Sequence, residues 1–235
     1  MGALSPTWQS RLFLICVLAT FGALFPIHSA SAKKIMVISA HPDDESLMAA
    51  GIIRSAINNG DQVNVVIMTN GDGNGGLTMG FTRMQESVNA MGVLGVNENN
   101  VIFLGYPDGL LSPLYRNPTT LTTSSSTGLS STYANRGLGR VDYHYYAFGV
   151  HGSYMGTTVL QDLTSLFQTF APDEIYTHQF YDAHQDHDYT NQFIIQAVLN
   201  MRKQGSSFAP ILYENIVHDQ LTSTCTTPWP DYSQT

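Results

Sequence analysis

The sequence predicts an α/β fold, a Rossmann-like three-layer sandwich in which a mostly parallel sheet lies between two layers of helices. From residue 33 onward, short β-branched runs alternate with segments whose apolar residues recur at helical spacing. The chain has 235 residues, of which 43% are hydrophobic and 12% charged, which is enough for one domain with a sizeable core. A long segment, about residues 107–156, breaks the alternation and is predicted to be a loop insertion.

Five short apolar runs are the predicted strands. They are residues 34–40, 63–69, 101–104, 174–177 and 211–217. The first run ends at His41-Pro42 and the second at Asn70-Gly71, and pairs that contain proline or glycine typically end a strand rather than continue it.

Three segments have the apolar spacing of amphipathic helices. They are residues 47–59, 82–94 and 188–202. Gly60 and Gly95 directly follow the first two and suit the left-handed conformation that ends a helix. Strands that alternate with helices imply a parallel sheet covered on both faces.

The insertion has two compositionally distinct parts. Residues 119–131 are a low-complexity Ser/Thr segment, and an aromatic-rich segment follows it. Long loops are usually functional or disordered, and this one is expected to contain both kinds of segment. Its aromatic residues could stack on a glycan, with Tyr146 as the candidate substrate contact. The simpler interpretation is that they pack the insertion onto the domain, because aromatic residues dominate core energetics; they are Tyr143, Tyr145, Tyr146, Phe148 and Tyr154.

The charge balance argues against a nucleic-acid partner. Lys and Arg total 10 against 18 for Asp and Glu, so the formal net charge is −8. No basic patch of the kind that attracts phosphate backbones is present in the sequence.

The first 32 residues have the layout of a secretory signal peptide. Arg11 precedes the apolar run 12–25, and small residues at 30–32 form a cleavage site. The run is shorter than the roughly 20 residues that span a membrane. We therefore expect a secreted protein without stable membrane association, with an uncleaved anchor in the endoplasmic reticulum membrane as the alternative. Cys225 would be the single cysteine of the mature chain, so no internal disulfide is expected.

Polar residues gather where two of the predicted strands end. The stretch from His41 to Glu45 follows the first strand, and a stretch containing His184 and His187 follows the fourth. Ligands of open α/β sheets bind at the carboxyl ends of the strands. Each stretch alone is explained as well by helix N-caps or surface residues, but two such stretches at the same edge favour a site. A histidine and an aspartate from the first stretch could reach a cation, and a metal needs a further ligand from elsewhere.

At this point the motifs resemble a known family. The stretch Ala40-His-Pro-Asp-Asp-Glu45 is similar to the signature of the PIG-L/LmbE-like N-acetylglucosaminyl deacetylases, zinc hydrolases that remove acetyl from amino sugars. Further similar blocks follow in order over about residues 33–217; they are Arg83-Met-Gln-Glu86, Leu104-Gly-Tyr-Pro-Asp108, Pro172-Asp-Glu-Ile-Tyr-Thr-His178 and His184-Gln-Asp-His187. Two features depart from the family pattern, namely Gln185 in place of the common proline and the long insertion.

The resemblance implies roles for the residues of both stretches. His41, Asp44 and His187 would hold Zn²⁺ or another divalent metal, which leaves positions open for water and the amide carbonyl. Asp43 would be the general base. His184 would stabilise the tetrahedral intermediate and, if protonated, deliver a proton to the leaving amine.

The neighbouring residues have less specific implied roles. Asp186 could orient a histidine or cap the helix that follows it. Glu45 is expected mainly to start a helix, where an acid is favoured by the macrodipole. Arg83 and Asp108 are candidate substrate contacts, and His178 is the remaining histidine expected nearest the metal.

The expected function is a zinc-dependent hydrolase that removes the N-acetyl group from an N-acetylglucosamine-type amino sugar or glycan. The deacetylase domain would cover residues 33–235, and because the chain stops soon after Trp229 it could be a fragment of a longer protein. The alternatives are a membrane-anchored N-acetylglucosaminyl-phosphatidylinositol deacetylase and a catalytically inactive glycan-binding protein. A non-haem iron oxygenase could also use a His-x-Asp pair, but those enzymes are built on a different, β-only fold.

Overall fold

The computed structural model describes residues 31–218. The signal-peptide prediction falls almost wholly outside this range, as do Cys225 and the chain end near Trp229. Among the described residues no helix is both long enough and apolar enough to cross a membrane.

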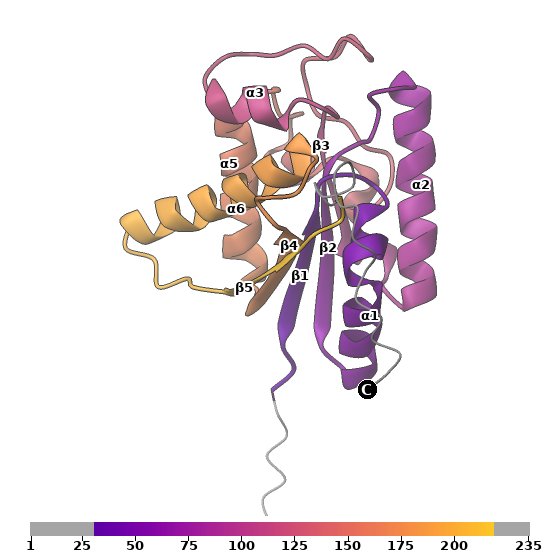
Figure 1. Ribbon diagram of the computed structural model, residues 1–235, viewed down its shortest axis with the longest axis vertical. Coiled ribbons are helices and arrows are strands. Elements are labelled where there is room, and N and C mark those ends of the chain that lie inside the picture. The colour runs from indigo at the N-terminus through magenta and orange to yellow at the C-terminus, as the bar shows by residue number, and fades with distance from the viewer. Residues whose placement is uncertain (1–30, 219–235) are drawn as a thin grey trace, which may run out of the picture. The chain divides into compact units, whose positions relative to one another are not determined.

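A sheet of five parallel strands forms the middle layer, which confirms the predicted α/β fold (Figure 1). Their spatial order is β3-β2-β1-β4-β5. The strands are β1 (Lys34–Ser39), β2 (Gln62–Thr69), β3 (Val101–Tyr106), β4 (Glu174–His178) and β5 (Ile211–Asn215). All five overlap the predicted runs to within a few residues.

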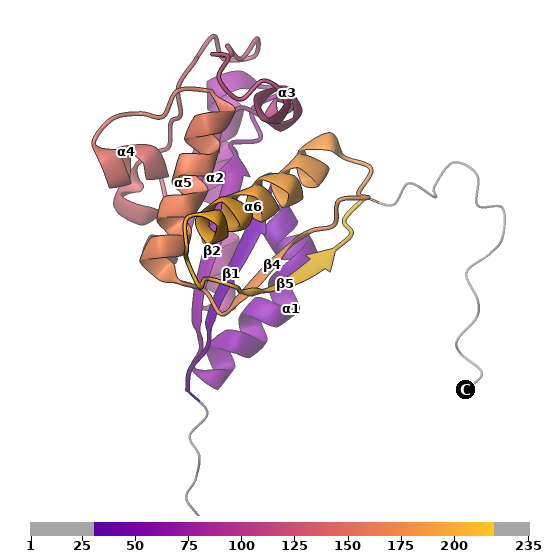
Figure 2. The ribbon, with the colours of Figure 1, turned by 90° about the vertical axis from the view of Figure 1, so that its left-hand side faces the viewer.

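Helices cover both faces of the sheet (Figures 1 and 2). The helices are α1 (Asp44–Asn59), α2 (Gly76–Leu94), α3 (Leu111–Arg116), α4 (Tyr143–Phe148), α5 (Gly156–Phe170) and α6 (Gln185–Lys203), with short 3-10 turns at Glu98–Asn100 and Leu138–Arg140. Helices α1 and α2 lie on one face, and α3, α5 and α6 lie on the other.

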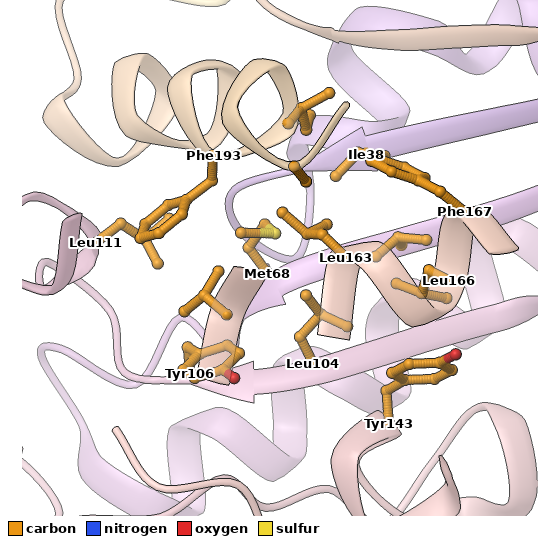
Figure 3. Packing of buried hydrophobic residues seen from close by; sticks show 14 of the residues in the cluster. Ile38, Met68, Leu104, Tyr106, Leu111, Tyr143, Leu163, Leu166, Phe167 and Phe193 are labelled. Atoms are coloured by element: carbon orange, nitrogen blue, oxygen red, sulfur yellow. The ribbon is translucent and has the colours of Figure 1, made fainter. Parts of the chain in front are cut away.

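The alternation of side chains along the strands explains the two layers. On β1, Ile35 and Val37 pack against residues of α1 and α2, whereas Met36 and Ile38 pack into the core under α5 and α6. Figure 3 shows this second core, where Phe193 of α6 and other apolar side chains meet the strands. Both faces of the central strand are therefore buried, as in other parallel sheets.

Helix α5 was not predicted, although it supplies the crossover from β3 back to β4. Val159, Leu163, Leu166 and Phe167 are buried along one side of it. The apolar spacing of a helix was thus present. The predicted insertion extended to residue 156, and a start at Gly-Thr-Thr has a low intrinsic helix propensity.

The insertion is ordered by hydrogen bonds within itself, and part of its aromatic set packs into the domain core. Thr122 donates its N–H to Tyr154 O at 3.0 Å, and Tyr154 donates to Ser130 O at 2.8 Å, so the Ser/Thr segment is paired rather than disordered. Tyr154 and Tyr143 are buried in the core, as the packing interpretation expects. The three other aromatic residues of the set are 41–54% exposed; they are Tyr145, Tyr146 and Phe148.

The strand order creates a switch point beside β1. The chain leaves β1 toward β2 and β3, then returns to place β4 on the other side of β1. Connections after β1 and β4 therefore run to opposite faces, and this is the place where ligands of open α/β sheets bind. The two polar stretches of the sequence meet there.

Candidate active site

Three side chains from the two polar stretches converge at the switch point. His41 follows β1, Asp44 begins α1, and His187 lies in the first turn of α6. Asp44 Oδ2 is 3.1 Å from both His41 Nδ1 and His187 Nε2, and these two nitrogens are 3.3 Å apart. All three residues are less than 10% exposed. We call these three residues the site triad.

The triad fits a tetrahedral zinc ion. Bonds of about 2.0–2.1 Å at tetrahedral angles separate neighbouring ligand atoms by about 3.3 Å, and the three observed separations are 3.1 to 3.3 Å. Two imidazoles and one carboxylate are also the ligand types of catalytic zinc sites. Three donor atoms leave part of the coordination shell open.

The outer nitrogen of His41 faces two further carboxylates. Nε2 lies 3.3 Å from Asp186 Oδ2 and 3.2 Å from Asp108 Oδ1. Asp186 is itself fixed, because it accepts the N–H groups of Gly109 at 2.6 Å and Leu111 at 3.1 Å. With a proton on Nε2, Nδ1 keeps its lone pair for the triad. The N-cap of α6 is His184, so the capping role considered for Asp186 belongs to His184 instead.

The carboxylates around His41 stabilise a positive charge at this site. Burial alone would lower the pKa of His41, but hydrogen bonds to Asp108, Asp186 and Asp44 raise it well above 6.5. Burial would likewise raise the pKa values of Asp44 and Asp108, yet their contacts with histidines lower both. Either a proton or a metal cation can supply this positive charge.

His184 lies beside the triad as a neutral ring. Burial, followed by the nearby charges of His41 and His187, lowers its pKa below 6.5. Its Nδ1 accepts the N–H of Asp186 at 3.2 Å, so the proton of the neutral ring is on Nε2. The ring stands edge-on to His41, with centroids 4.6 Å apart. His184 therefore offers one N–H donor next to the triad.

Asp43 has an unusual backbone conformation at the start of α1. Its φ of 127° is in a region that non-glycine residues rarely adopt, which indicates local strain at the site. Its side chain is 60% exposed and accepts a hydrogen bond from Arg83 at 2.9 Å. Arg83 also donates to Pro42 O at 2.6 Å and to Gly71 O at 3.2 Å. Arg83 thus contacts Asp43 and the loop backbone, and its role as a substrate contact stays a prediction.

Glu45 has a different environment from the one expected for a first-turn helix acid. Its side chain is fully buried, and burial raises its pKa to about 7 despite an N–H bond from Asp43 at 3.0 Å. Its Oε1 has no partner among the described residues. The sequence showed the acid but not its burial, because burial depends on α2 packing over α1.

The two remaining predicted substrate contacts, Asp108 and Tyr146, lie in different parts of the structure. Asp108 lies at the site, where its Oδ2 also accepts the N–H of Gly73 at 3.2 Å. Tyr146 lies on α4, where its ring is 6.4 Å from that of Tyr143, and α4 packs against β3, the edge strand farthest from β4. No contact of Tyr146 with the triad is present.

Two residues near the triad had no assigned ligand role in the sequence. His178 is buried, accepts the N–H of Ala40 at 3.0 Å and stacks on His187 with ring centroids 3.8 Å apart. Asp182 lies 3.1 Å from Nδ1 of His187. Burial would raise the pKa of Asp182, but backbone N–H donors lower it. The sequence could have indicated Asp182, since metal-bound histidines commonly pair with a carboxylate and Asp182 is close to His187 in the chain.

Solved structures share this fold at low sequence identity. The deacetylase Dbv21, which acts on the A40926 pseudoaglycone, is 16% identical, with a TM-score of 0.51 over 85% of this chain and 70% of that one. GalB, the 4-carboxy-2-hydroxymuconate hydratase of Pseudomonas putida KT2440, is also 16% identical, with a TM-score of 0.51 over 77% and 65%. The N,N'-diacetylchitobiose deacetylase of Pyrococcus horikoshii is 22% identical, with a TM-score of 0.46 over 72% and 50%. The chain thus spans about half to two thirds of the length of several such structures.

The sequence comparisons are more specific than the fold. Among curated proteins no sequence matches the chain at a significant level. A family model described as PIG-L, GlcNAc-PI de-N-acetylase, matches residues 36–198, which include most of β1, the whole site triad and most of α6. This match covers well over half of the chain and confirms the resemblance of its motifs. The chain belongs to the PIG-L family.

Proposed function

We propose that the protein is a zinc-dependent hydrolase that removes the N-acetyl group from an N-acetylglucosamine-type amino sugar or glycan. The observation that carries the proposal is the triad, whose three donor atoms converge within 3.3 Å. Family membership supports the same reaction class. The fold alone does not, because a deacetylase and a hydratase share it.

In this proposal His41, Asp44 and His187 hold the metal. A zinc ion there would supply Lewis-acid polarisation of the amide carbonyl and a lowered pKa for water. Asp186 keeps the ring of His41 in place through its outer nitrogen. The carboxylate of Asp44 is fixed by the backbone N–H of His41 at 2.9 Å.

Asp43 is proposed as the general base. It is next to Asp44 in the chain, but its side chain points to solvent and pairs with Arg83 rather than joining the triad. One carboxylate oxygen is held by Arg83, which leaves the other free to accept a proton from the attacking water. Arg83 thereby acts to position the base.

His184 is proposed as the hydrogen-bond donor to the oxygen that becomes negative during attack. Its Nε2–H is available because Nδ1 is occupied by a backbone N–H. The lowered pKa of His184 argues against a protonated ring at neutral pH. The proton needed by the leaving amine then comes from Asp43, which has taken one from water.

The experiment is acetate release by the purified protein from a panel of substrates. The panel contains N-acetylglucosamine, chitin oligosaccharides and an N-acetylglucosaminyl-phosphatidylinositol analogue, each with and without a chelator. We expect acetate and a free amine from one class, loss of activity with chelator, and recovery with added Zn²⁺. Chelator-insensitive release would contradict the metal requirement, and release of acetate from no member of the panel would contradict the proposed function.

Location and substrate class are linked in this proposal. A cleaved signal peptide favours a secreted enzyme on soluble glycans, whereas a retained one favours the lipid-linked substrate. N-terminal sequencing of the expressed protein separates the two. A start at residue 33 supports secretion, and a start at residue 1 or 2 contradicts it.

A further inference from the structure

We propose that Asp182 is the positioning residue for His187: its carboxylate holds the imidazole in the one orientation that directs Nε2 at His41 and Asp44. This inference rests on the metal site of the proposed function and adds a residue outside the triad. It also connects the chain beyond β5 to the site.

The carboxylate of Asp182 joins three separate parts of the chain. Oδ1 accepts the backbone N–H of His184 at 3.0 Å and lies 3.1 Å from Nδ1 of His187. Oδ2 accepts the backbone N–H groups of Val217 at 2.8 Å and His218 at 3.0 Å. One side chain therefore links the loop before α6, the first turn of α6 and the segment after β5.

Both ring nitrogens of His187 lie 3.1 Å from a carboxylate oxygen, Nδ1 from Asp182 Oδ1 and Nε2 from Asp44 Oδ2. A metal held by Nε2 takes the lone pair of that nitrogen, so the proton of the metal-binding ring belongs on Nδ1, on the side of Asp182. Nε2 then presents its lone pair 3.1 Å from Asp44 Oδ2 and 3.3 Å from His41 Nδ1. Metal-bound histidines usually donate their other N–H to a carboxylate or carbonyl in this way.

The surroundings keep both side chains in place. The side chain of Asp182 has no exposed surface, and neither has that of His187. Asp182 donates its own N–H to Gln179 O at 3.1 Å, which closes the loop that carries it. On the adjoining ring face, His178 stacks on His187 at 3.8 Å. A tilt of the His187 ring would break at least one of these contacts.

The variant Asp182→Asn separates orientation from packing. An amide has nearly the volume of a carboxylate, but it offers one accepting oxygen and one donating NH₂. Both oxygens of Asp182 face N–H donors, so the NH₂ must meet donors on one side. It faces either His184 and His187 or Val217 and His218, and each arrangement disturbs the position of His187.

The first measurement is the zinc affinity of the full chain, by competition with a chromophoric chelator. We expect Asp182→Asn to weaken Zn²⁺ binding by roughly 10- to 100-fold, the usual effect of losing such a partner. The matched control is Asp188→Asn, because Asp188 lies in the same turn of α6 and accepts its hydrogen bond from Gln192 at 2.7 Å. The control should bind zinc like the wild type.

The second measurement needs no zinc. Imidazole ¹⁵N–¹H correlation spectra report the tautomer of each histidine, and His187→Ala identifies the signals of His187. In the metal-free wild type and in Asp188→Asn we expect the Nδ1–H tautomer to be populated, because Asp182 competes with Asp44 for the ring proton. In Asp182→Asn we expect the proton to shift toward Nε2, which still faces the carboxylate of Asp44.

The outcomes distinguish this inference from the proposed function. Unchanged zinc affinity and an unchanged tautomer in Asp182→Asn overturn it, whether or not the variant is less stable. A wild type that binds zinc but releases no acetate defeats the proposed function and leaves the role of Asp182 intact. If the wild type binds no zinc, the metal site fails, and the tautomer still decides whether Asp182 orients the ring.

Discussion

Two groups of histidine and aspartate side chains in this molecule have similar composition but differ in how their ligand atoms are arranged. In the site triad, Asp44 Oδ2 and two imidazole nitrogens converge on one small region. In a second group, which we call the insertion cluster, His144 Nδ1 of the insertion pairs with Asp162 Oδ1 of α5 at 2.6 Å, and His151 Nδ1 pairs with Asp142 Oδ2 at 2.5 Å within the insertion.

In the insertion cluster, the carboxylate oxygens are occupied by hydrogen bonds from histidines and from nearby hydroxyl groups. Asp162 also accepts the hydroxyl of Tyr106 at 2.7 Å, and Asp142 also accepts that of Thr132 at 2.7 Å. Among the described residues, the groups that could hold a metal all lie at the switch point, and none includes a residue of the insertion cluster. Histidine and aspartate side chains therefore do not make a metal site by their type alone. What distinguishes the triad is that its ligand atoms point at a common centre.

The largest expected effect comes from removing a triad ligand. His187→Ala should reduce zinc affinity by more than the roughly 10- to 100-fold typical of outer contacts, and acetate release should fall below detection. Metal content after dialysis measures the change. The paired variant His144→Ala removes a histidine of similar burial from the insertion cluster and should keep its zinc. Full metal content in His187→Ala would contradict the assignment of His187 as a ligand.

Loss of the proposed base should affect turnover and leave the metal in place. Asp43→Asn is expected to lower kcat by about 10²- to 10⁴-fold, because water loses its proton acceptor while the triad is untouched. Metal analysis and acetate release on the same sample check both parts. Loss of zinc in this variant would show that Asp43 belongs with the ligands.

A smaller, pH-dependent effect is expected at Glu45. Its pKa is raised from 4.5 to about 7 by burial, so the folded protein holds this proton after the unfolded chain has lost it. The free energy of unfolding should therefore fall as pH rises through this window. Glu45→Gln should recover up to about 3 kcal/mol at pH 8 and almost nothing at pH 4.

Denaturant melts of the chelator-treated protein at both pH values test this prediction. The control is Glu86→Gln, because Glu86 is an exposed acid on α2. An equal gain at pH 4 and pH 8 would mean that Glu45 acts through packing and not through its charge.

The smallest effect is expected within the insertion cluster. Thr132 donates to Asp142 and accepts the N–H of Gly152, both at 2.7 Å. Thr132→Val keeps the shape of the side chain but leaves two buried groups without this partner, at a cost of about 1–3 kcal/mol in unfolding free energy. Zinc affinity should not change. A parallel loss of zinc affinity would show that the two clusters are coupled.

The sequence was enough to predict most local elements and the edge of the sheet where the polar residues meet. Hydrophobic periodicity located five strands and three helices because it reflects which side of each element is buried. The motif from His41 to Glu45 and the histidines at 184 and 187 followed predicted strands, so their place at one edge was predictable. Local pattern was insufficient for α5, which follows a long irregular insertion.

The contacts that each polar residue makes depend on the tertiary structure. Strand order brings Asp108, from the end of β3, within 3.2 Å of His41, and α6 brings Asp186 to the same nitrogen. Asp182 reaches Val217, which is 35 residues away in the chain. Such pairings depend on the switch point between β1 and β4 and on helix packing. Residue spacing does not encode them, because they join segments whose separation is set by the whole sheet.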